Sequence, residues 1–283
     1  MILVTGASGQ LGTALLRALP PGRVVTTSRR PVAGPRHVTA DQADPGWADA
    51  LAAGAADTEF AVLLASRITT STSLAELAAQ AELELRGPLD LLHRLPRLRH
   101  VVYASSVTVY RAGGPLAEDA PRAPANVYAC VKLLAEDLLG VLAARRGIPL
   151  AILRIAQVFG PGSPPGEIIA RMCAAARAGR RLEVSCGPDA FRDYVDEDDV
   201  AAAIVSAIER RADGAVNVGS GKKTTIAGLA AEIAAAAGAP APDVTDGRPT
   251  FSMVLNVARA RSWLGWEARR SPSDEIRRRL RGP

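Results

Sequence analysis

The segment that decides the fold lies near the amino terminus and reads Ile2-Leu3-Val4-Thr5-Gly6-Ala7-Ser8-Gly9-Gln10-Leu11-Gly12. A short apolar run, typical of a buried strand, leads into a glycine-rich turn and then into a helical pattern over residues 11–19. Gly6 permits a sharp turn, Gly9 lets backbone amides approach an anion, and Gly12 lets helix and strand pack closely. Because a helix N-terminus favours negative charge, this order predicts a dinucleotide site made by Gly6, Ser8, Gly9, Gln10, Leu11 and Gly12.

Short β-branched runs alternate with longer helical patterns over the first half of the chain. We expect strands over residues 2–5, 23–27, 60–65, 100–104 and 151–155, and helices over residues 11–19, 74–92 and 127–146. This alternation is typical of βαβ units around a parallel sheet. The sequence therefore predicts an α/β fold of the Rossmann type, with a doubly wound parallel sheet.

A proline- and glycine-rich cluster at residues 160–166 marks the best internal boundary. Beyond it, short isolated strands separate helices expected over residues 167–178, 198–210, 226–237 and 273–280. We expect a dinucleotide-binding domain over residues 1–160 and a smaller mixed α/β substrate-binding region over residues 161–283, with segments of the two free to interleave.

Composition limits the possible functions. The 283 residues carry 34 Lys and Arg against 29 Asp and Glu, a net charge of +5, and are 48% hydrophobic, which excludes extensive disorder. No apolar run approaches the roughly 18 residues of a spanning helix, and no basic leader precedes the first strand, so we expect a cytoplasmic protein without a membrane partner. Three cysteines and three histidines, without ligand spacing, predict no metal site. Aromatic residues make up only 4%, which argues against nucleic-acid binding.

The choice of cofactor depends on the end of the second strand. Enzymes that use NAD place an acidic side chain there, whereas this chain has Ser28-Arg29-Arg30, and a guanidinium pair suits a 2′-phosphate. NADP(H) is therefore favoured over NAD(H); the alternative is that the arginines are solvated and NAD binds. Asp41 and Gln42, after the third strand, either contact the adenine or belong to a surface loop. We also expect Leu64, Ala65 and Ser66, where the buried run over residues 60–65 ends, to line the cofactor site.

A second motif, Tyr128-Ala129-Cys130-Val131-Lys132, lies within a predicted helix. Residues four apart share a helix face, so the Lys132 ammonium is expected beside the Tyr128 phenol. A phenol has an ordinary pKa near 10, and a nearby cation favours its ionised form, which suits acid–base chemistry at neutral pH. Ser106, at the carboxyl end of a sheet strand where ligands bind, completes a candidate catalytic set.

Together these motifs resemble the extended short-chain dehydrogenase/reductase family, in its branch of nucleotide-sugar epimerases, dehydratases and ketoreductases. The resemblance rests on residues 5–12, 103–110, 128–132, 159–162, 191–195, 198–201 and 216–221, in family order. It implies a catalytic Ser106, an acid–base Tyr128 and a Lys132 that binds the cofactor ribose. It further implies that Arg192 and Gln157 contact a nucleotide-sugar substrate, and that the two long helices mediate a homodimer.

Departures from the family pattern narrow the expected function. Sugar dehydratases of the branch follow their catalytic residue with Asp-Glu, and here Val107-Thr108 follow Ser106, which disfavours dehydration. Glu84 and Gln157 stand where the family has asparagines. The pair Ser28-Arg29 fits an exchangeable NADPH better than it fits a tightly held NAD. The sequence thus favours an NADPH-dependent ketoreductase of a nucleotide-activated 4-keto-6-deoxysugar, with dTDP as the favoured nucleotide. The alternatives are an NAD-dependent nucleotide-sugar epimerase and a non-catalytic dinucleotide-binding regulator.

Overall fold

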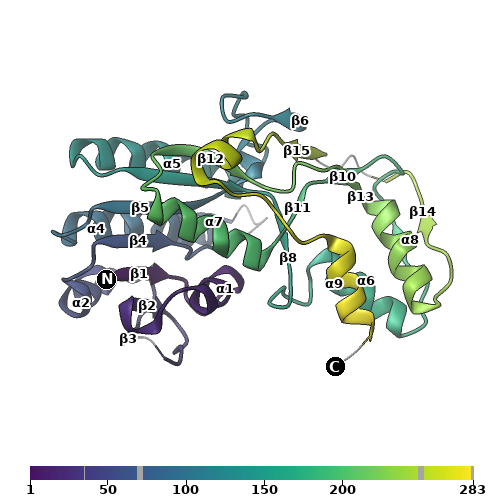
Figure 1. Cartoon of the computed structure of the whole chain (residues 1–283), viewed down its shortest axis with the longest axis horizontal. Coiled ribbons are helices and arrows are strands. Elements are labelled where there is room, and N and C mark those ends of the chain that lie inside the picture. Colours follow the sequence, from purple (N-terminus) through teal and green to yellow (C-terminus); the bar gives the residue numbers. More distant parts are fainter. Residues whose placement is uncertain (35, 69–72, 248–251, 282–283) are drawn as a thin grey trace.

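Seven parallel strands form the central sheet, in the order β12-β7-β5-β4-β1-β2-β3 (Figure 1). The computed structural model describes residues 1–34, 36–68, 73–247 and 252–281. The strands span Ile2–Thr5 (β1), Val24–Ser28 (β2), Arg36–Thr39 (β3), Phe60–Leu63 (β4), His100–Ser106 (β5), Leu150–Ile155 (β7) and Gly214–Val218 (β12). The chain builds outward from β1 in one direction through β2 and β3 and in the other through β4, β5 and β7. This confirms the doubly wound Rossmann-type sheet, and the order reverses between β1 and β4, where such sheets bind ligands.

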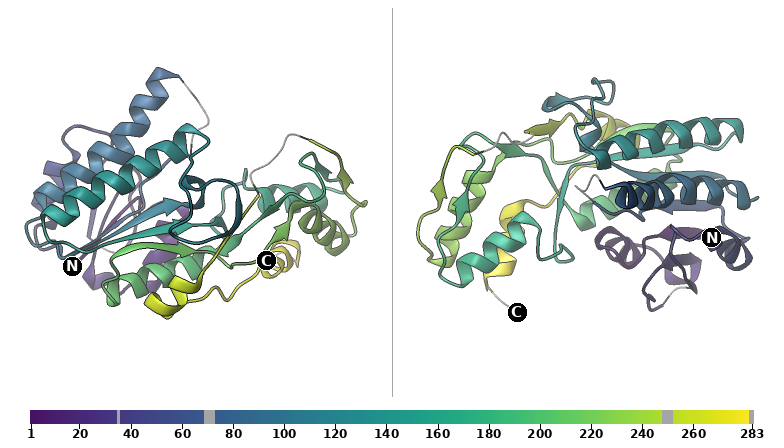
Figure 2. Two further views of the ribbon diagram at one scale, coloured as in Figure 1. Left: turned by 90° about the horizontal axis from the view of Figure 1, so that it is seen from above. Right: turned by 180° about the vertical axis from the view of Figure 1, so that it is seen from behind.

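Helices cover both faces of the sheet (Figure 2). Helices α1 (Gln10–Ala18) and α7 (Glu197–Glu209) pack on one face, and α2 (Trp47–Ala55), α4 (Gly87–Arg94) and α5 (Val127–Arg145) pack on the other. Within β1, Ile2 and Val4 join the first core while Leu3 joins the second. Because central strands such as β4 are covered on both faces, they read as continuous apolar runs and not as alternating ones, whereas the edge strand β3 is partly exposed.

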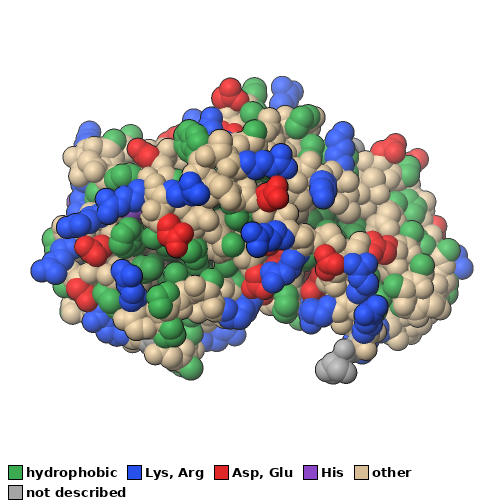
Figure 3. Space-filling model, viewed as in Figure 1, with side chains coloured by type: hydrophobic (Ala, Val, Ile, Leu, Met, Phe, Trp, Pro, Cys, Tyr) green, Lys and Arg blue, Asp and Glu red, His purple; other side chains and the backbone are tan. Residues whose placement is uncertain are grey.

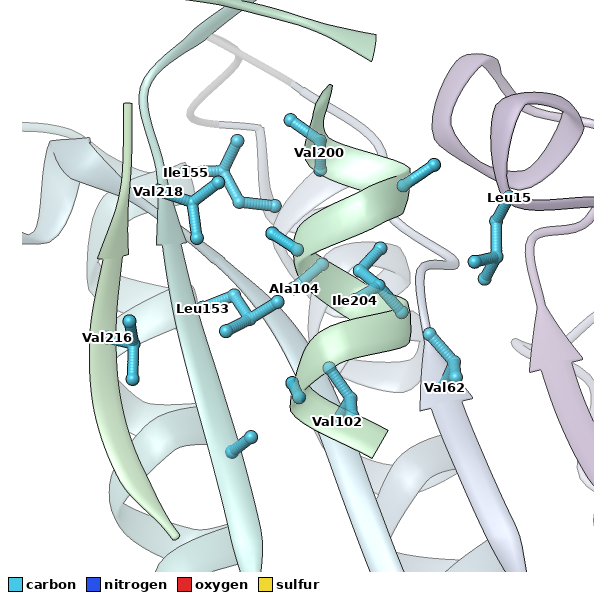
Figure 4. Close-up of a cluster of buried hydrophobic side chains, with 14 of the residues drawn as sticks. Leu15, Val62, Val102, Ala104, Leu153, Ile155, Val200, Ile204, Val216 and Val218 are labelled. Atoms are coloured by element: carbon cyan, nitrogen blue, oxygen red, sulfur yellow. The ribbon is translucent and has the colours of Figure 1, made fainter. Parts of the chain in front are cut away.

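The segment after residue 160 completes this sheet. Strand β12 pairs in parallel with β7, and Val200 and Ile204 of α7 pack between Leu15 of α1 and the strands (Figure 4). The layer of α1 and α7 thus joins parts of the chain from both sides of the proline- and glycine-rich cluster.

A smaller lobe lies beyond the carboxyl ends of the strands, at the right of Figure 1. Its core is formed by α6 (Ile168–Arg177), α8 (Ile226–Ala237) and α9 (Pro272–Arg281). Outside the central sheet, short strands form two-stranded sheets. These are β8 (Gln157–Phe159) with β11 (Tyr194–Asp196), β10 (Phe191–Arg192) with β13 (Thr224–Thr225), β9 (Glu183–Val184) with β14 (Asp243–Val244), and β6 (Gly113–Leu116) with β15 (Met253–Leu255). The remaining turns are 3-10 helices at Pro21–Arg23 (η1) and Val107–Val109 (η3) and a π-helical turn at Ala260–Leu264 (η4).

Two expected elements differ from the structure. The run over residues 60–65 stops being a strand after Leu63, because the amides of Leu64 and Ala65 turn to the Thr5 hydroxyl, at 3.1 and 3.2 Å. The helix expected over residues 74–92 consists of α3 (Leu74–Ala81), the π-helical turn η2 (Glu82–Arg86) and α4. The turn widens where Pro88, which has no amide hydrogen, cannot donate to the Glu84 carbonyl.

The surface carries mixed charge. On the face shown in Figure 3, basic and acidic side chains are interspersed. Ion pairs between half-exposed side chains include that of Arg36 with Asp57, at 2.6 Å. Within the described residues, no helix has both the length and the apolar character needed to cross a membrane. Nor do His, Cys, Asp or Glu side chains of those residues gather in a group of three or more suited to a metal ion.

Candidate cofactor and active site

The glycine turn after β1 is held by close backbone packing. Gly6 has a φ of +65°, and a Cβ atom there would lie 2.7 Å from the backbone nitrogen of Ala65. At Gly12 a Cβ atom would collide with the Gly6 carbonyl oxygen. Helix α1 begins after Gly9, whose lack of a side chain leaves the first amides of the helix without a side-chain cap. These amides can therefore bind an anion.

A cleft of about 760 Å³ opens beside this turn. It is lined by the residues Gly6, Ser8, Gly9, Ser28, Arg29, Arg30, Asp41, Gln42, Leu64, Ala65 and Ser66, all of which were predicted for the cofactor. The structure adds Thr27, Ala40, Ala43, Arg67, Glu76, Ala79, Gln80 and Leu83, which the sequence analysis missed. The last four lie on the segment of α3 and η2, whose position over the cleft is not evident from local sequence.

Five residues predicted to bind the cofactor do not line this cleft: Gln10, Leu11, Gly12, Tyr128 and Lys132. The Gln10 amide instead donates to Glu197 and to Ser163, both at 3.0 Å. Glu197 is fully buried and also accepts from the Gly162 amide at 2.9 Å. Gln10 therefore links the start of α1 to the loop after β8.

The arginines after β2 stand at one end of the cleft. Arg30 donates to the Ser8 carbonyl at 3.3 Å, which joins this loop to the glycine turn. The Arg29 side chain is 73% exposed, and its Nε lies 4.0 Å from a carboxylate oxygen of Asp41. Ser28 donates to the Arg30 carbonyl at 2.7 Å. The end of the second strand thus presents cations to the cleft, while Asp41 balances one of them.

Gln42 is buried, so its assignment to a surface loop is wrong. Its amide nitrogen donates to the Leu83 carbonyl at 2.6 Å, while its side-chain oxygen is buried and has no hydrogen-bond partner in the described part of the chain. A buried acceptor without a partner is costly. The glycine turn, with the uncapped amides at the start of α1, makes the cleft chemically suited to the phosphates of a dinucleotide.

Tyr128 and Lys132 lie on the first turns of α5, which Asn126 caps by accepting from the Ala129 amide at 2.9 Å. The Lys132 ammonium lies 5.8 Å from the centre of the Tyr128 ring. It is buried and donates to the Glu84 carboxylate at 2.9 Å and to the Ala104 carbonyl at 2.8 Å. Burial lowers the pKa of Lys132, but the Glu84 carboxylate, together with Tyr128 and Glu136, outweighs this effect, and the net shift is upward.

Ser106 ends strand β5, and its hydroxyl oxygen accepts two hydrogen bonds from Thr108, at 3.2 Å from the amide and 3.0 Å from the hydroxyl. Since these bonds occupy both lone pairs, the hydroxyl hydrogen of Ser106 is available to a third group.

A second cavity, of about 230 Å³, opens next to this set. Val107, Thr108, Ala125 and Asn126 form one side, close in sequence to Ser106 and Tyr128, and Gln157, Arg192, Asp193 and Met253 complete it. The structure thus brings the predicted substrate contacts Gln157 and Arg192 to one cavity. Thr108 and Asn126 are detectable from their positions beside the motifs, whereas no signal in the sequence indicates Met253.

The segment that bears Arg192 is fixed by its neighbour. Asp193 is buried and accepts hydrogen bonds from the amides of Ser220, Gly221 and Leu255, at 2.8 to 3.1 Å. Burial raises the pKa of Asp193 despite these bonds, and burial also lowers the pKa of Arg192. Asp193 thereby ties the Arg192 strand to the loop after β12.

The comparisons with known proteins agree with this geometry. The model of the NAD dependent epimerase/dehydratase family matches residues 2–219. The chain therefore belongs to this family, within the extended short-chain dehydrogenases/reductases, and is an NAD(P)-dependent oxidoreductase of that type.

Among its relatives, a dTDP-L-rhamnose 4-epimerase from Burkholderia thailandensis is 27% identical over 94% of this chain and 90% of its own. A dTDP-6-deoxy-L-talose 4-dehydrogenase (NAD(P)(+)) from Kitasatospora kifunensis is 33% identical over 64% of this chain and 61% of its own. The solved structure of MoeE5 in complex with UDP-glucose and NAD is 26% identical, with a TM-score of 0.86 over 99% of this chain and 97% of that chain.

Proposed function

We propose that the protein is an NADPH-dependent ketoreductase that acts on a nucleotide-activated 4-keto-6-deoxysugar, with dTDP as the nucleotide. The observation that carries the choice of cofactor is the Arg29 and Arg30 pair at the end of β2, in the place of an acidic side chain. The Kitasatospora relative, a 4-dehydrogenase of a dTDP-deoxysugar named for both NAD⁺ and NADP⁺, supports reaction at this sugar carbon.

The chain's own residues supply acid catalysis in this proposal. When bound, the dinucleotide provides the hydride for the keto carbon. Tyr128 donates a proton to the sugar oxygen as negative charge develops on it, and the free Ser106 hydroxyl hydrogen donates a hydrogen bond to the same oxygen. Lys132, whose ammonium lies 5.8 Å from the Tyr128 ring centre, places a positive charge beside the phenolate that remains and binds the ribose hydroxyls. Arg192 and Gln157 hold the nucleotide diphosphate, and the lobe of α6, α8 and α9 closes the substrate side.

The cofactor released from freshly purified protein tests this function. A reductase should yield little bound cofactor and should oxidise NADPH when a dTDP-4-keto-6-deoxysugar is added, with weaker activity towards NADH. Tightly held NAD, together with interconversion of two sugar nucleotides without net cofactor consumption, would support the epimerase instead. That second candidate is favoured by the Burkholderia relative, which is a 4-epimerase of a dTDP sugar, and by Asp41, whose carboxylate balances Arg29.

A homodimer is proposed through the exposed face of α5. Leu134, Leu138 and Val141 follow one stripe of this helix and are 47%, 38% and 56% exposed. Leu74, at the start of the neighbouring α3, is 83% exposed. A second copy of the chain would bury both helices in a single interface. Light scattering on Leu138→Glu should then give the monomer mass where the unmodified protein gives twice that mass.

A further inference from the structure

A buried carboxylate lies beside the proposed catalytic pair, at a position where the family has an asparagine. The side chains of Glu84 and Lys132 are 0% and 2% exposed, and their charged atoms are 2.9 Å apart. A charge in such a position is strongly unfavourable unless it is paired. The two groups therefore depend on each other.

Local sequence explains how Glu84 reaches this place. It lies in the π-helical turn η2, where the Gly87 amide donates to the Glu82 carbonyl and Pro88 has no amide hydrogen to offer to the Glu84 carbonyl. Turns of this kind occur often at functional sites. The widened turn packs against α5, and Glu84 lies buried in that contact.

Besides Glu84, the Tyr128 phenol faces Lys132, and the other carboxylates nearby already have cationic partners. Glu136, one turn further along α5, pairs with Arg154 at 2.7 Å. On the segment of Glu84 itself, Glu82 pairs with Arg86 at the surface. The remaining contacts of Glu84 are with uncharged donors, the Tyr103 hydroxyl on β5 and the Gln80 amide on α3, both at 3.3 Å. Glu84 is therefore the counter-charge of Lys132.

An ammonium group has three N–H donors. Glu84 and the Ala104 carbonyl take two of them, so one remains for the ribose hydroxyls. We propose that Glu84 is the positioning residue of the Tyr128 and Lys132 pair: its carboxylate fixes the Lys132 ammonium and keeps it charged within the protein interior. This rests on the catalytic roles proposed above, but the interaction itself can be measured without substrate.

The chain has only three lysines, Lys132, Lys222 and Lys223, and the latter two are exposed. Carbon-13 labelling of the lysine side chains should thus give three resolvable NMR signals, with Lys132 assigned by its loss in Lys132→Met. In the unmodified protein the Lys132 signal should not titrate below about pH 10. In Glu84→Gln the strongest of the interactions that oppose burial is lost, with Tyr128 and Glu136 still in place, so the titration midpoint should fall by roughly one to three pH units.

Glu82→Gln is the matched control, since it removes the same charge two residues away at the surface, and it should leave the Lys132 signal unchanged. Glu84→Asn, which restores the family residue, should lower the Lys132 titration midpoint as Glu84→Gln does. It takes the place of Glu84→Gln in the experiment if that variant does not fold. An unmoved midpoint in either folded variant, or a Lys132 in the unmodified protein that titrates well below pH 10, would overturn the proposal.

Turnover provides the second measurement. In Glu84→Gln, activity should fall with rising pH as Lys132 loses its proton, whereas Glu82→Gln should follow the unmodified protein. An unchanged pH profile beside a lowered lysine midpoint would contradict the positioning role. Absence of ketoreductase activity in the unmodified protein would count against the proposed function, while the NMR titration would still decide whether Glu84 keeps Lys132 charged.

Discussion

Replacement of Arg29 by alanine tests the choice of cofactor at its physical origin. In the proposed complex the guanidinium faces the 2′-phosphate that NADPH has and NADH lacks. Removing it should weaken NADPH binding and leave NADH binding nearly unchanged, because NADH has no 2′-phosphate for Arg29 to contact. The measured quantity is therefore the ratio of the two dissociation constants.

The structure limits the size of this effect. A hydrogen bond to a charged group contributes about 1.5 to 3 kcal/mol. Arg29 is 73% exposed and lies 4.0 Å from the Asp41 carboxylate, and exchanging that surface pair for the phosphate costs up to about 1 kcal/mol. The net preference attributable to Arg29 is then about 0.5 to 3 kcal/mol, or roughly two- to 150-fold. Asp41→Asn, which removes the competing carboxylate, should increase the preference for NADPH.

Isothermal titration calorimetry measures these ratios, with NADPH and NADH each titrated into the unmodified protein, Arg29→Ala and Asp41→Asn. Arg36→Ala is the matched control, because Arg36 is also an exposed arginine in a surface ion pair, with Asp57, but does not line the cleft. Ser28→Asp added to Arg29→Ala should move the preference further towards NADH, since a carboxylate repels the phosphate and accepts from the ribose hydroxyls. Equal binding of both cofactors by the unmodified protein, or an unchanged ratio in Arg29→Ala, would refute the reasoning.

Four further variants test the site and its stability. Tyr128→Phe should lower turnover by about 10² to 10⁴ with little change in cofactor affinity; retention of more than about a tenth of the activity excludes Tyr128 as the acid. Lys132→Met should lower the free energy of unfolding by about 3 to 5 kcal/mol, because it leaves Glu84 buried and unpaired, and adding Glu84→Gln should recover part of this loss in urea denaturation. Arg192→Ala should raise KM for the sugar nucleotide far more than for the cofactor, and equal effects would assign Arg192 a structural role. His100→Gln should reduce the loss of stability on acidification: burial lowers the pKa of His100 in the folded state, so as pH falls below about 6.5 the unfolded chain takes up the proton first and the fold is destabilised. Thermal unfolding at pH 7.5 and 5.5 measures this difference, and an equal decline in both proteins would contradict it.

The sequence alone determined those features that depend on local order. A strand, a glycine turn and a helix follow one another within residues 2–18, so hydrophobic periodicity and the needs of Gly6 and Gly12 were enough to predict them. Tyr128 and Lys132 share a helix face because of their spacing alone. The parallel sheet followed from the alternation of elements, since strands buried on both faces must be apolar throughout.

The tertiary structure decided what depends on contacts between distant segments. Glu84 and Lys132 are 48 positions apart, and only the packing of η2 against α5 makes them an ion pair. Gln42 faces Leu83 across 41 positions and is buried for that reason, and Gln10 turns away from the cleft because Glu197 lies within its reach. Strand β12 joins the sheet through its pairing with β7, although it follows the proline- and glycine-rich cluster. In each case the free energy of a buried polar or apolar group depends on its partner, and that partner is fixed by the fold and not by the neighbouring sequence.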